Sequence, residues 1–304
     1  MGANPIPSLY PVMKRITHLK TYGYLLPGLF FMGIFTFIPV FMSAYLSLFK
    51  WNVNNPEPQW TWFSNYIEVF KASLFWLVLR NNLIYAFTTI PISMSLALFL
   101  AILINQKMGT IRSFYRASLF YPTMVPMVAA AMLWVWIFNP GLGIFNYYLG
   151  FLGFPKIEWL YDMRYALIAI IIMSIWKNFG YYMLIFLAGL QGIPNHYYEA
   201  ASIEGATGWK QFRYITFPML APATLFVFVV AIISSFQVFD QVFVMTQGGP
   251  GDRTNVLVFY IYQHAFRFWD LGMGSTLTTL FILGLLVAIW LVFRVIGRRV
   301  YYEV

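Results

Sequence analysis

The chain contains no cysteine, only three histidines and few charged residues. The absence of cysteine excludes a disulfide framework, a thiol nucleophile and a metal site built from thiolates. His18, His196 and His264 are far apart and do not have the HExxH spacing of a metalloprotease. Charged residues make up only 10% of the 304 residues, against about 25% in an ordinary soluble domain. The composition is therefore not that of a soluble globular protein.

The sequence also lacks the short motifs of common catalytic sites. It has no GxxxxGK[ST] loop for nucleotide phosphates, no GxSxG nucleophile elbow and no set of kinase motifs. Its carboxylates are few and fall mostly between the apolar runs, which argues against a pair for acid–base work. A membrane enzyme is therefore disfavoured. We expect a protein that is not an enzyme and that needs no cofactor or metal.

Apolar residues are abundant, at 61% of the sequence, and the mean hydropathy is +0.70. A membrane-spanning helix needs about 20 mainly apolar residues. Pro91, Pro122 and Pro126 lie inside such runs and predict kinks. The first run is too long for the apolar part of a cleaved signal peptide, so we expect it to remain as a span. We predict an all-α, polytopic membrane protein with six transmembrane helices, at residues 22–49, 81–104, 117–138, 165–190, 221–245 and 271–293.

The lysines and arginines are distributed unevenly between the two sides that six spans create. If both termini share a side, that side holds 11 of these residues and the other holds 7. Cytoplasmic segments carry the excess of positive charge in membrane proteins. We therefore predict that both termini, and the segment between the fourth and fifth spans, are cytoplasmic. The net charge of +9 is spread between apolar runs, which argues against nucleic acid as a partner.

Two charged residues, Lys177 and Asp240, lie inside predicted spans. A charge at the bilayer centre costs about 2.5–3.5 kcal/mol on insertion scales, so each needs a polar cavity, an interface or a partner. Asn178 adjoins the lysine, and Gln237 and Gln241 flank the aspartate. In one interpretation these five side chains line a path for a solute. In the other, Lys177 and Asp240 form a structural ion pair or lie near the membrane surface. The sequence leaves both open.

The segment 199–218, EAASIEGATGWKQFRYITFP, is polar within a mostly apolar chain. Pro194 and Asn195 predict the start of a helix before it. Gly205 predicts the end of that helix, because glycine adopts a positive φ angle at little cost. Thr207 is placed to cap a second helix over residues 208–217. The pattern therefore predicts two short helices joined by a turn.

These helices have the features of a docking element. The small side chains of Ala200 and Ala201 let a partner approach closely, and Ile203, Trp209 and Phe212 supply apolar anchors. Such a helix fits a groove on another protein. The alternative is an amphipathic helix that lies on the lipid surface.

The spacing within this segment resembles the EAA loop of permease subunits of binding-protein-dependent ABC importers. That motif has Glu-Ala-Ala, three residues, Gly, nine residues, Ile, one residue and then Leu-Pro. Phe217 replaces the usual leucine, and Glu204 stands where many members have aspartate. The stretches NPGLGIFN and TQGGPG, and the ending YEV after a basic tail, are similar to the sugar branch of the family. The matching motif residues are Glu199, Ala200, Ala201, Gly205, Ile215 and Pro218.

The resemblance implies the type I importer permease fold, in a prokaryotic plasma membrane, with a cytoplasmic coupling helix in a loop at residues 191–221. It implies two cytoplasmic ATP-binding subunits, with Glu199 against their surface, Ala200 and Ala201 allowing close approach and Gly205 setting the bend. It also implies a second, homologous permease subunit and an extracytoplasmic solute-binding protein that meets the external segments. The solute implied is a sugar. One transmembrane domain would occupy residues 1–304, with short cytoplasmic tails at 1–20 and 297–304.

Two other transport functions compete with a sugar importer. A permease for glycerol-3-phosphate or a related polyol phosphate would need several convergent basic residues, and Lys177 is the only basic residue inside a predicted span. An ion-coupled secondary transporter would use intramembrane charges as coupling sites but would need neither an ATPase nor an EAA loop. Both remain alternatives to the sugar importer.

Overall fold

The computed structural model describes residues 23–106 and 111–295. The predicted cytoplasmic tails, residues 1–20 and 297–304, lie outside these ranges.

Five of the described helices are long and apolar enough to cross a membrane. They confirm the predicted spans at 22–49, 81–104, 165–190, 221–245 and 271–293, although the second begins earlier than predicted. The five are Gly23–Leu46, with the π-helical turn η1 (Gly33–Phe37) and α2 (Ile38–Leu46); α4 (Ser73–Asn105); α8 (Ala166–Gln191); Ala221–Met245, with α12 (Ala221–Phe236) and α13 (Asp240–Met245); and α15 (Leu271–Val295).

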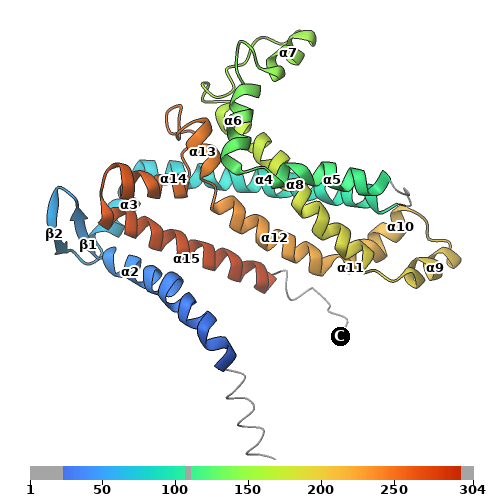
Figure 1. Ribbon diagram of the computed structural model, residues 1–304, viewed down its shortest axis with the longest axis horizontal. Helices are drawn as coiled ribbons and strands as arrows, with labels where there is room; N and C mark the ends of the chain where they lie inside the picture. Colours follow the sequence, from blue (N-terminus) through green and yellow to red (C-terminus); the bar gives the residue numbers. More distant parts are fainter. Residues whose placement is uncertain (1–22, 107–110, 296–304) are drawn as a thin grey trace, which may run out of the picture.

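The predicted third span, residues 117–138, is two helices rather than one. α5 (Ile111–Met124) and α6 (Met127–Ile137) meet at an angle of 95°, and the membrane spans number six only if this bent pair is counted as one. Pro126 lies at the break and has no N–H to donate to the carbonyl of Pro122, so the helical ladder cannot continue. Figure 1 shows α6 and α7 (Ile144–Phe151) projecting from the long helices.

The chain is mostly helical, as predicted, and the one short sheet among the described residues was not predicted. An antiparallel hairpin of β1 (Phe49–Asn52) and β2 (Asn55–Trp60) follows the first span, and α3 (Ser64–Lys71) follows the hairpin. Phe49 pairs with Trp60, and their rings meet edge to face at 4.8 Å. Such cross-strand aromatic pairs stabilise a hairpin. Between the last two spans lie α14 (Leu257–Tyr262) and the π-helical turn η3 (Gln263–Arg267).

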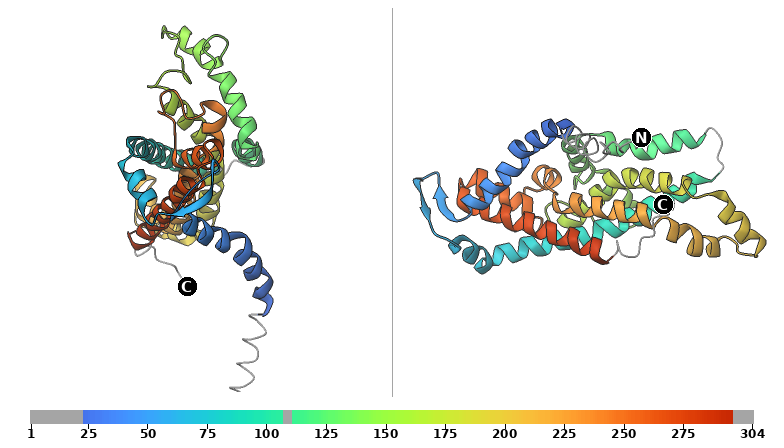
Figure 2. Two further views of the ribbon diagram at one scale, coloured as in Figure 1. Left: turned by 90° about the vertical axis from the view of Figure 1, so that its left-hand side faces the viewer. Right: turned by 90° about the horizontal axis from the view of Figure 1, so that it is seen from below.

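α8 is the central helix of the bundle. In its most apolar stretch 61% of the residues are buried by the chain itself, against 17% in α15 and none in the first span. α4, α5 and α12 pack around it, as the two views of Figure 2 show. Gly180 brings α5 close, because a Cβ atom there would lie 2.3 Å from the carbonyl oxygen of Leu119. The first span therefore presents its apolar side chains to whatever surrounds the chain.

The segment after the first span and the predicted EAA loop, which are predicted to lie on opposite sides of the membrane, lie at opposite ends of the long helices (Figure 1). The hairpin and α3 occupy one end of the long helices (Figure 1). The other end carries four short helices in the region of the predicted EAA loop. They are α9 (Asn195–Ile203), α10 (Trp209–Gln211), the π-helical turn η2 (Phe212–Thr216) and α11 (Phe217–Met219).

Candidate functional site

The first helix of the 199–218 segment begins and ends as predicted. α9 starts at Asn195 after Pro194 and ends at Ile203. Gly205 has a φ angle of +76° and donates its N–H to the carbonyl of Ser202 at 3.1 Å. Ala206 donates to the carbonyl of Ala201 at 2.8 Å. These two bonds form a Schellman motif, in which a residue with positive φ closes the helix.

The second helix begins differently from the prediction. Gly208, not Thr207, is the N-cap of α10, and no side chain caps this helix. From Trp209 the chain stays helical through the π-helical turn η2 to Met219. A π turn carries an extra residue, and this one ends two residues before Pro218, whose ring cannot continue a regular hydrogen-bond ladder. Ile215 and Met219 pack with Tyr198 against the core formed by α4, α8 and α12.

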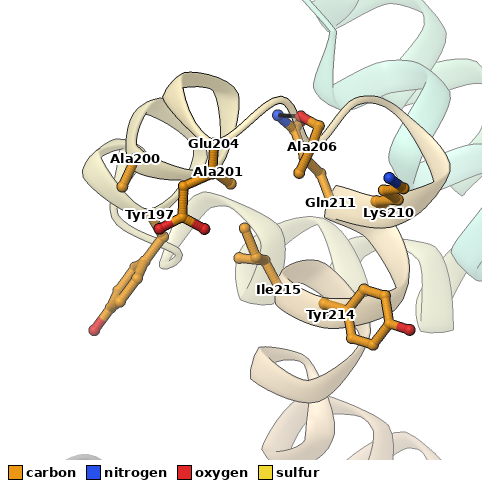
Figure 3. A pocket seen from close by; sticks show the side chains of 9 residues that line it. All are labelled: Tyr197, Ala200, Ala201, Glu204, Ala206, Lys210, Gln211, Tyr214 and Ile215. Atoms are coloured by element: carbon orange, nitrogen blue, oxygen red, sulfur yellow. Dashed lines mark hydrogen bonds between the residues drawn. The ribbon is translucent and has the colours of Figure 1, made fainter.

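The segment has two helical arms: α9, and the helical stretch from Trp209 to Met219. These arms enclose a hollow of about 390 Å³ (Figure 3). Ala200, Ala201 and Ile215 line its apolar part, and Glu204 and Lys210 also line it. Around it the surface is rich in exposed motif residues and anchors: the side chains of Glu199 and Ala200 are exposed, as are Ile203 (88%) and Trp209 (73%). Apolar side chains this exposed at one end of a membrane protein indicate a contact surface.

Lys177 lies in the middle of α8, where only 6% of its surface is exposed. Its ammonium donates hydrogen bonds to the carbonyl oxygens of Pro122 (2.8 Å), Thr123 (2.8 Å) and Val125 (2.6 Å). The carbonyl of Pro122 needs a donor because Pro126 cannot supply one. An ammonium has three N–H donors, so all three are used. Lys177 therefore caps the end of α5 at the bend and has no donor left for a solute in this conformation.

The ion pair between Lys177 and Asp240, one of the two interpretations of these charges, is not formed. Asp240 instead begins α13 and is half-buried. A carboxylate in the first turn is favoured by the positive end of the helix dipole. The ion pairs within residues 23–106 and 111–295 join other residues at exposed positions: Lys50 with Glu68, and Arg164 with Asp162.

Gln241 connects three helices in the interior. It is buried and donates from Nε2 to the hydroxyl of Tyr85 on α4 (3.2 Å) and to Oγ of Ser174 on α8 (3.3 Å). Asn178 lies one turn beyond Ser174 on α8 and is half-buried, whereas Gln237 is exposed at the end of α12. The structure therefore brings Gln241, Asn178 and Lys177 to one region of α8. Whether these residues and Asp240 line a solute path stays a prediction.

The span that contains Asp240 is itself interrupted. α12 ends at Phe236 and α13 begins at Asp240, and Phe239 between them has the non-helical angles φ −146° and ψ −62°. Non-helical backbone at membrane depth is stable only where protein buries it or where it borders a polar cavity. Two interrupted spans, one at Pro126 and one at Phe239, thus contact the same central helix α8.

The sequence analysis missed the uncharged polar residues of the second span. Asn81, Asn82 and Thr89 are all buried in α4. Asn81 donates to the carbonyls of Asp252 (2.8 Å) and Asn255 (3.0 Å), which fastens the loop before α14. These residues are uncharged, so a search for charges inside the spans does not find them. Their spacing does indicate them, because Asn81, Tyr85 and Thr89 follow each other at four-residue intervals and so share one helix face.

The chain is a bundle of apolar helices with two interrupted spans around a polar centre. At one end it carries the exposed short helices α9 and α10. This arrangement defines a membrane transport protein of the permease class. Residues 93–301 match the family described as binding-protein-dependent transport system inner membrane component. The chain belongs to this family of transport permeases, which are multi-pass membrane proteins and not enzymes.

Related proteins agree with this assignment. The chain is 36% identical to the probable ABC transporter permease protein PH1215 of Pyrococcus horikoshii, over 88% of this chain and 91% of that protein. It is 32% identical to the trehalose/maltose transport system permease protein MalF of Thermococcus litoralis, over 91% and 93% of the two chains. Its fold matches a chain in the crystal structure of a bacterial alginate ABC transporter in complex with an alginate pentasaccharide-bound periplasmic protein, with a TM-score of 0.83, 21% identity and coverage of 97% and 99%.

Proposed function

We propose that this chain is the transmembrane permease subunit of an ATP-driven, binding-protein-dependent sugar importer. It forms half of the translocation path, and separate cytoplasmic subunits hydrolyse ATP. Closure of those subunits switches the permease pair between inward-open and outward-open states, a rigid-body two-state transition. The loop at residues 191–221 couples the two events.

The observation that carries this proposal is the geometry of α9. The helix ends in a Schellman turn at Gly205, has no buried residue and presents Glu199 and Ala200 at the surface. A short helix with small exposed side chains fits a groove on a partner. Glu199 is placed for polar contact with the ATPase, and Ala200 and Ala201 permit close approach. Ile215 and Pro218 then connect this surface to the start of α12.

The interrupted spans support a solute path beside α8. Broken helices near the middle of a membrane place backbone polar groups and helix ends where a solute passes. We propose that Asn178, Gln237, Asp240 and Gln241 contribute to this path. Lys177 borders it but holds the bend of the third span.

A neutral sugar suits this polar centre better than a phosphorylated solute. An anion needs positive groups with free donors, and the donors of Lys177 are all engaged by carbonyl oxygens. The relatives include permeases for trehalose/maltose and for sn-glycerol-3-phosphate, both 32% identical to this chain, so the choice of a neutral sugar rests on the engaged donors of Lys177.

Three further partners follow from the surfaces of the chain. The first span has no buried residue in its apolar stretch, so it is available to lipid and to a second, homologous permease. The end that carries the hairpin and α3 is the proposed site for an extracytoplasmic solute-binding protein. Both termini and the coupling loop are then cytoplasmic in a prokaryotic plasma membrane.

The test is transport by the reconstituted complex. The chain is expressed with a second permease, the ATPase and the binding protein encoded beside it, and uptake of labelled sugars and of glycerol-3-phosphate into vesicles is measured. We expect uptake that requires ATP and the binding protein and that is selective for a sugar. Uptake by this chain alone, driven by an ion gradient, would contradict the proposal and favour a secondary transporter.

A matched pair of glycines tests the coupling loop. Gly205 and Gly153 have nearly equal φ angles, +76° and +78°, and each donates its N–H to a carbonyl three residues back at 3.1 Å. Proline is incompatible with both the angle and the hydrogen bond. We expect Gly205→Pro to detach the ATPase or abolish uptake, and Gly153→Pro, on the external side, to leave the ATPase attached. An equal loss of ATPase from both variants would contradict a specific role for the loop.

A further inference from the structure

Around α9 the coupling loop combines limited packing with side-chain hydrogen bonds. α9 has no buried residue, and no other element of the described chain packs extensively against it. To pass a force to the membrane spans, α9 has to be linked to the second arm of the loop. The links are found among residues that the EAA motif does not include.

Gln211 makes the first link. From the second arm, its Nε2 donates to Oγ of Ser202 on α9 (3.0 Å) and to the carbonyl of Ala206 in the turn (2.9 Å). The hydroxyl of Ser202 in turn donates to the carbonyl of Tyr198 at 2.7 Å. One amide group therefore joins the end of α9, the turn and the second arm.

Tyr198 makes the second link. Its hydroxyl shares a hydrogen bond of 3.0 Å with Oγ1 of Thr216, which is buried at the end of η2. Tyr198 also packs with Ile215 against the core of α4, α8 and α12. Leu220, next to α12, is 1% exposed, so the second arm is anchored firmly in the bundle. A continuous connection thus runs from α9 through Tyr198 and Thr216 to the start of the fifth span.

These links separate two hollows. On the outer side is the hollow of about 390 Å³ between the arms. On the inner side, a hollow of about 640 Å³ separates the loop from the end of α4, and Tyr198, Gln211 and Thr216 line it. Gln211 borders both hollows. With space on either side, the angle between the arms depends on the hydrogen bonds of Gln211 and Tyr198, together with the packing of Tyr198 and Ile215.

We propose that Gln211 and Tyr198 are positioning residues that make the coupling loop a single rigid lever. This inference rests on the proposed function, since a lever needs an ATPase to move it. When the ATPase displaces α9, the two links carry that displacement to α12 instead of letting the arms fold toward each other across the hollows. Without the links the ATPase still docks and hydrolyses ATP, but each cycle moves the spans less completely.

The experiment measures sugar imported per ATP hydrolysed in the reconstituted complex. Gln211→Met removes the amide, Gln211→Glu replaces its NH2 donors with a negatively charged acceptor, and Tyr198→Phe removes only the hydroxyl. We expect each to lower the ratio roughly two- to tenfold, the effect of losing a hydrogen bond. The ATPase should co-purify with each variant at the wild-type level. A general folding defect would reduce the amount of complex but would not change this ratio.

Two controls sharpen the test. Gln106→Met makes the same substitution on the α4 side of the inner hollow, and it should keep the wild-type ratio. Adding Ser202→Ala to Gln211→Met should have no effect beyond that of Gln211→Met, because both remove the same link. Additive effects would show that the two residues act separately and would overturn the lever.

Two other outcomes would also overturn the inference. An unchanged ratio in the Gln211 and Tyr198 variants would show that the links carry no force, and loss of the ATPase from the purified complex would show that these residues dock it. Both differ from a failure of the proposed function itself. In that case the unmodified chain would import solute without ATP.

Discussion

The side chain of Lys177 shows how one residue can satisfy a charge in the apolar interior. Within the described part of the chain its ammonium has no carboxylate partner, and it binds three carbonyls that a proline-broken helix leaves free. Hydrogen bonds to a charged group are stronger than those between neutral groups. Thr123 returns a bond from Oγ1 to the carbonyl of Lys177 at 3.2 Å. The contact thus fastens α5 to α8 from both sides.

Replacing this lysine tests its role as a helix cap. Lys177→Met leaves buried carbonyls without a donor, which costs roughly 1–3 kcal/mol. We expect a lower midpoint of thermal unfolding for the purified protein, and a KM for sugar uptake equal to that of the wild type. Lys177→Arg retains donors and should recover part of the stability. A stable Lys177→Met variant with a raised KM would instead place Lys177 among the solute contacts.

His264 makes the segment between the last two spans sensitive to pH. Burial lowers the pKa of His264 below its ordinary value of 6.5, and the Asp270 carboxylate partly opposes this. Its Nδ1 atom is buried without a hydrogen-bond partner in the described part of the chain. The unfolded chain then binds the proton more readily than the folded chain. Stability is therefore full above pH 6.5 and falls as the pH drops below it.

The thermal midpoint at pH 7.5 and at pH 5 measures this effect. We expect a drop in the wild-type protein and a smaller drop in His264→Phe, which keeps the ring contacts with Tyr260 and Phe268. Equal drops in both proteins would assign the pH dependence to other groups.

At the scale of elements, close contact between α5 and α8 decides the shape of the third span. Pro126 breaks the ladder, Lys177 caps the end that results, and Gly180 lets the two helices touch. An alanine at position 180 would push against the backbone of Leu119. The bend of 95° is thus held by groups from another helix and not by the proline alone.

A pair of glycine substitutions measures this contact. Gly180→Ala overpacks the interface, which costs roughly 1–3 kcal/mol. Gly284→Ala on α15 meets open space and should be neutral or stabilising, by up to about 1 kcal/mol. We expect the midpoint of thermal unfolding to fall only in the first variant. If Gly180→Ala were as stable as Gly284→Ala, the close approach of α5 would not matter for stability.

At the scale of the whole molecule, the arrangement of long helices places the hairpin and the coupling loop at opposite ends (Figure 1). The charge bias predicts that the loop end is cytoplasmic. Because the chain has no cysteine, single cysteines can report this orientation without background labelling. Gln59 in the hairpin and Thr207 in the loop are both exposed.

We expect Gln59→Cys in intact cells to react with a membrane-impermeant maleimide, and Thr207→Cys to react only after the membrane is opened. The reverse pattern would contradict the predicted orientation. Labelling of both residues from outside would contradict their placement on opposite sides of the membrane.

Features that depend on neighbouring residues were predicted correctly more often than features that depend on residues far apart in the chain. Spans depend on the summed hydropathy of about 20 consecutive residues, so five of them were found. The turn at Gly205 was also found, because a Schellman motif lies within a few residues of chain. The hairpin at 49–60 was missed, since two strands this short give only a weak local pattern. The N-cap at Gly208 was missed because Thr207 offers an equally good local cap.

By itself, the sequence determined that the chain lies in a membrane, where it crosses, and which segment has the EAA spacing. These properties follow from the residues of one short window at a time. Only the tertiary structure decided that Lys177 caps α5 rather than pairing with Asp240, and that Gln211 and Tyr198 form hydrogen bonds between the two arms of the 191–221 loop. Lys177 meets its acceptors across 52 to 55 positions of chain. Such contacts depend on how close packing and a proline break set one helix against another, which no local pattern contains.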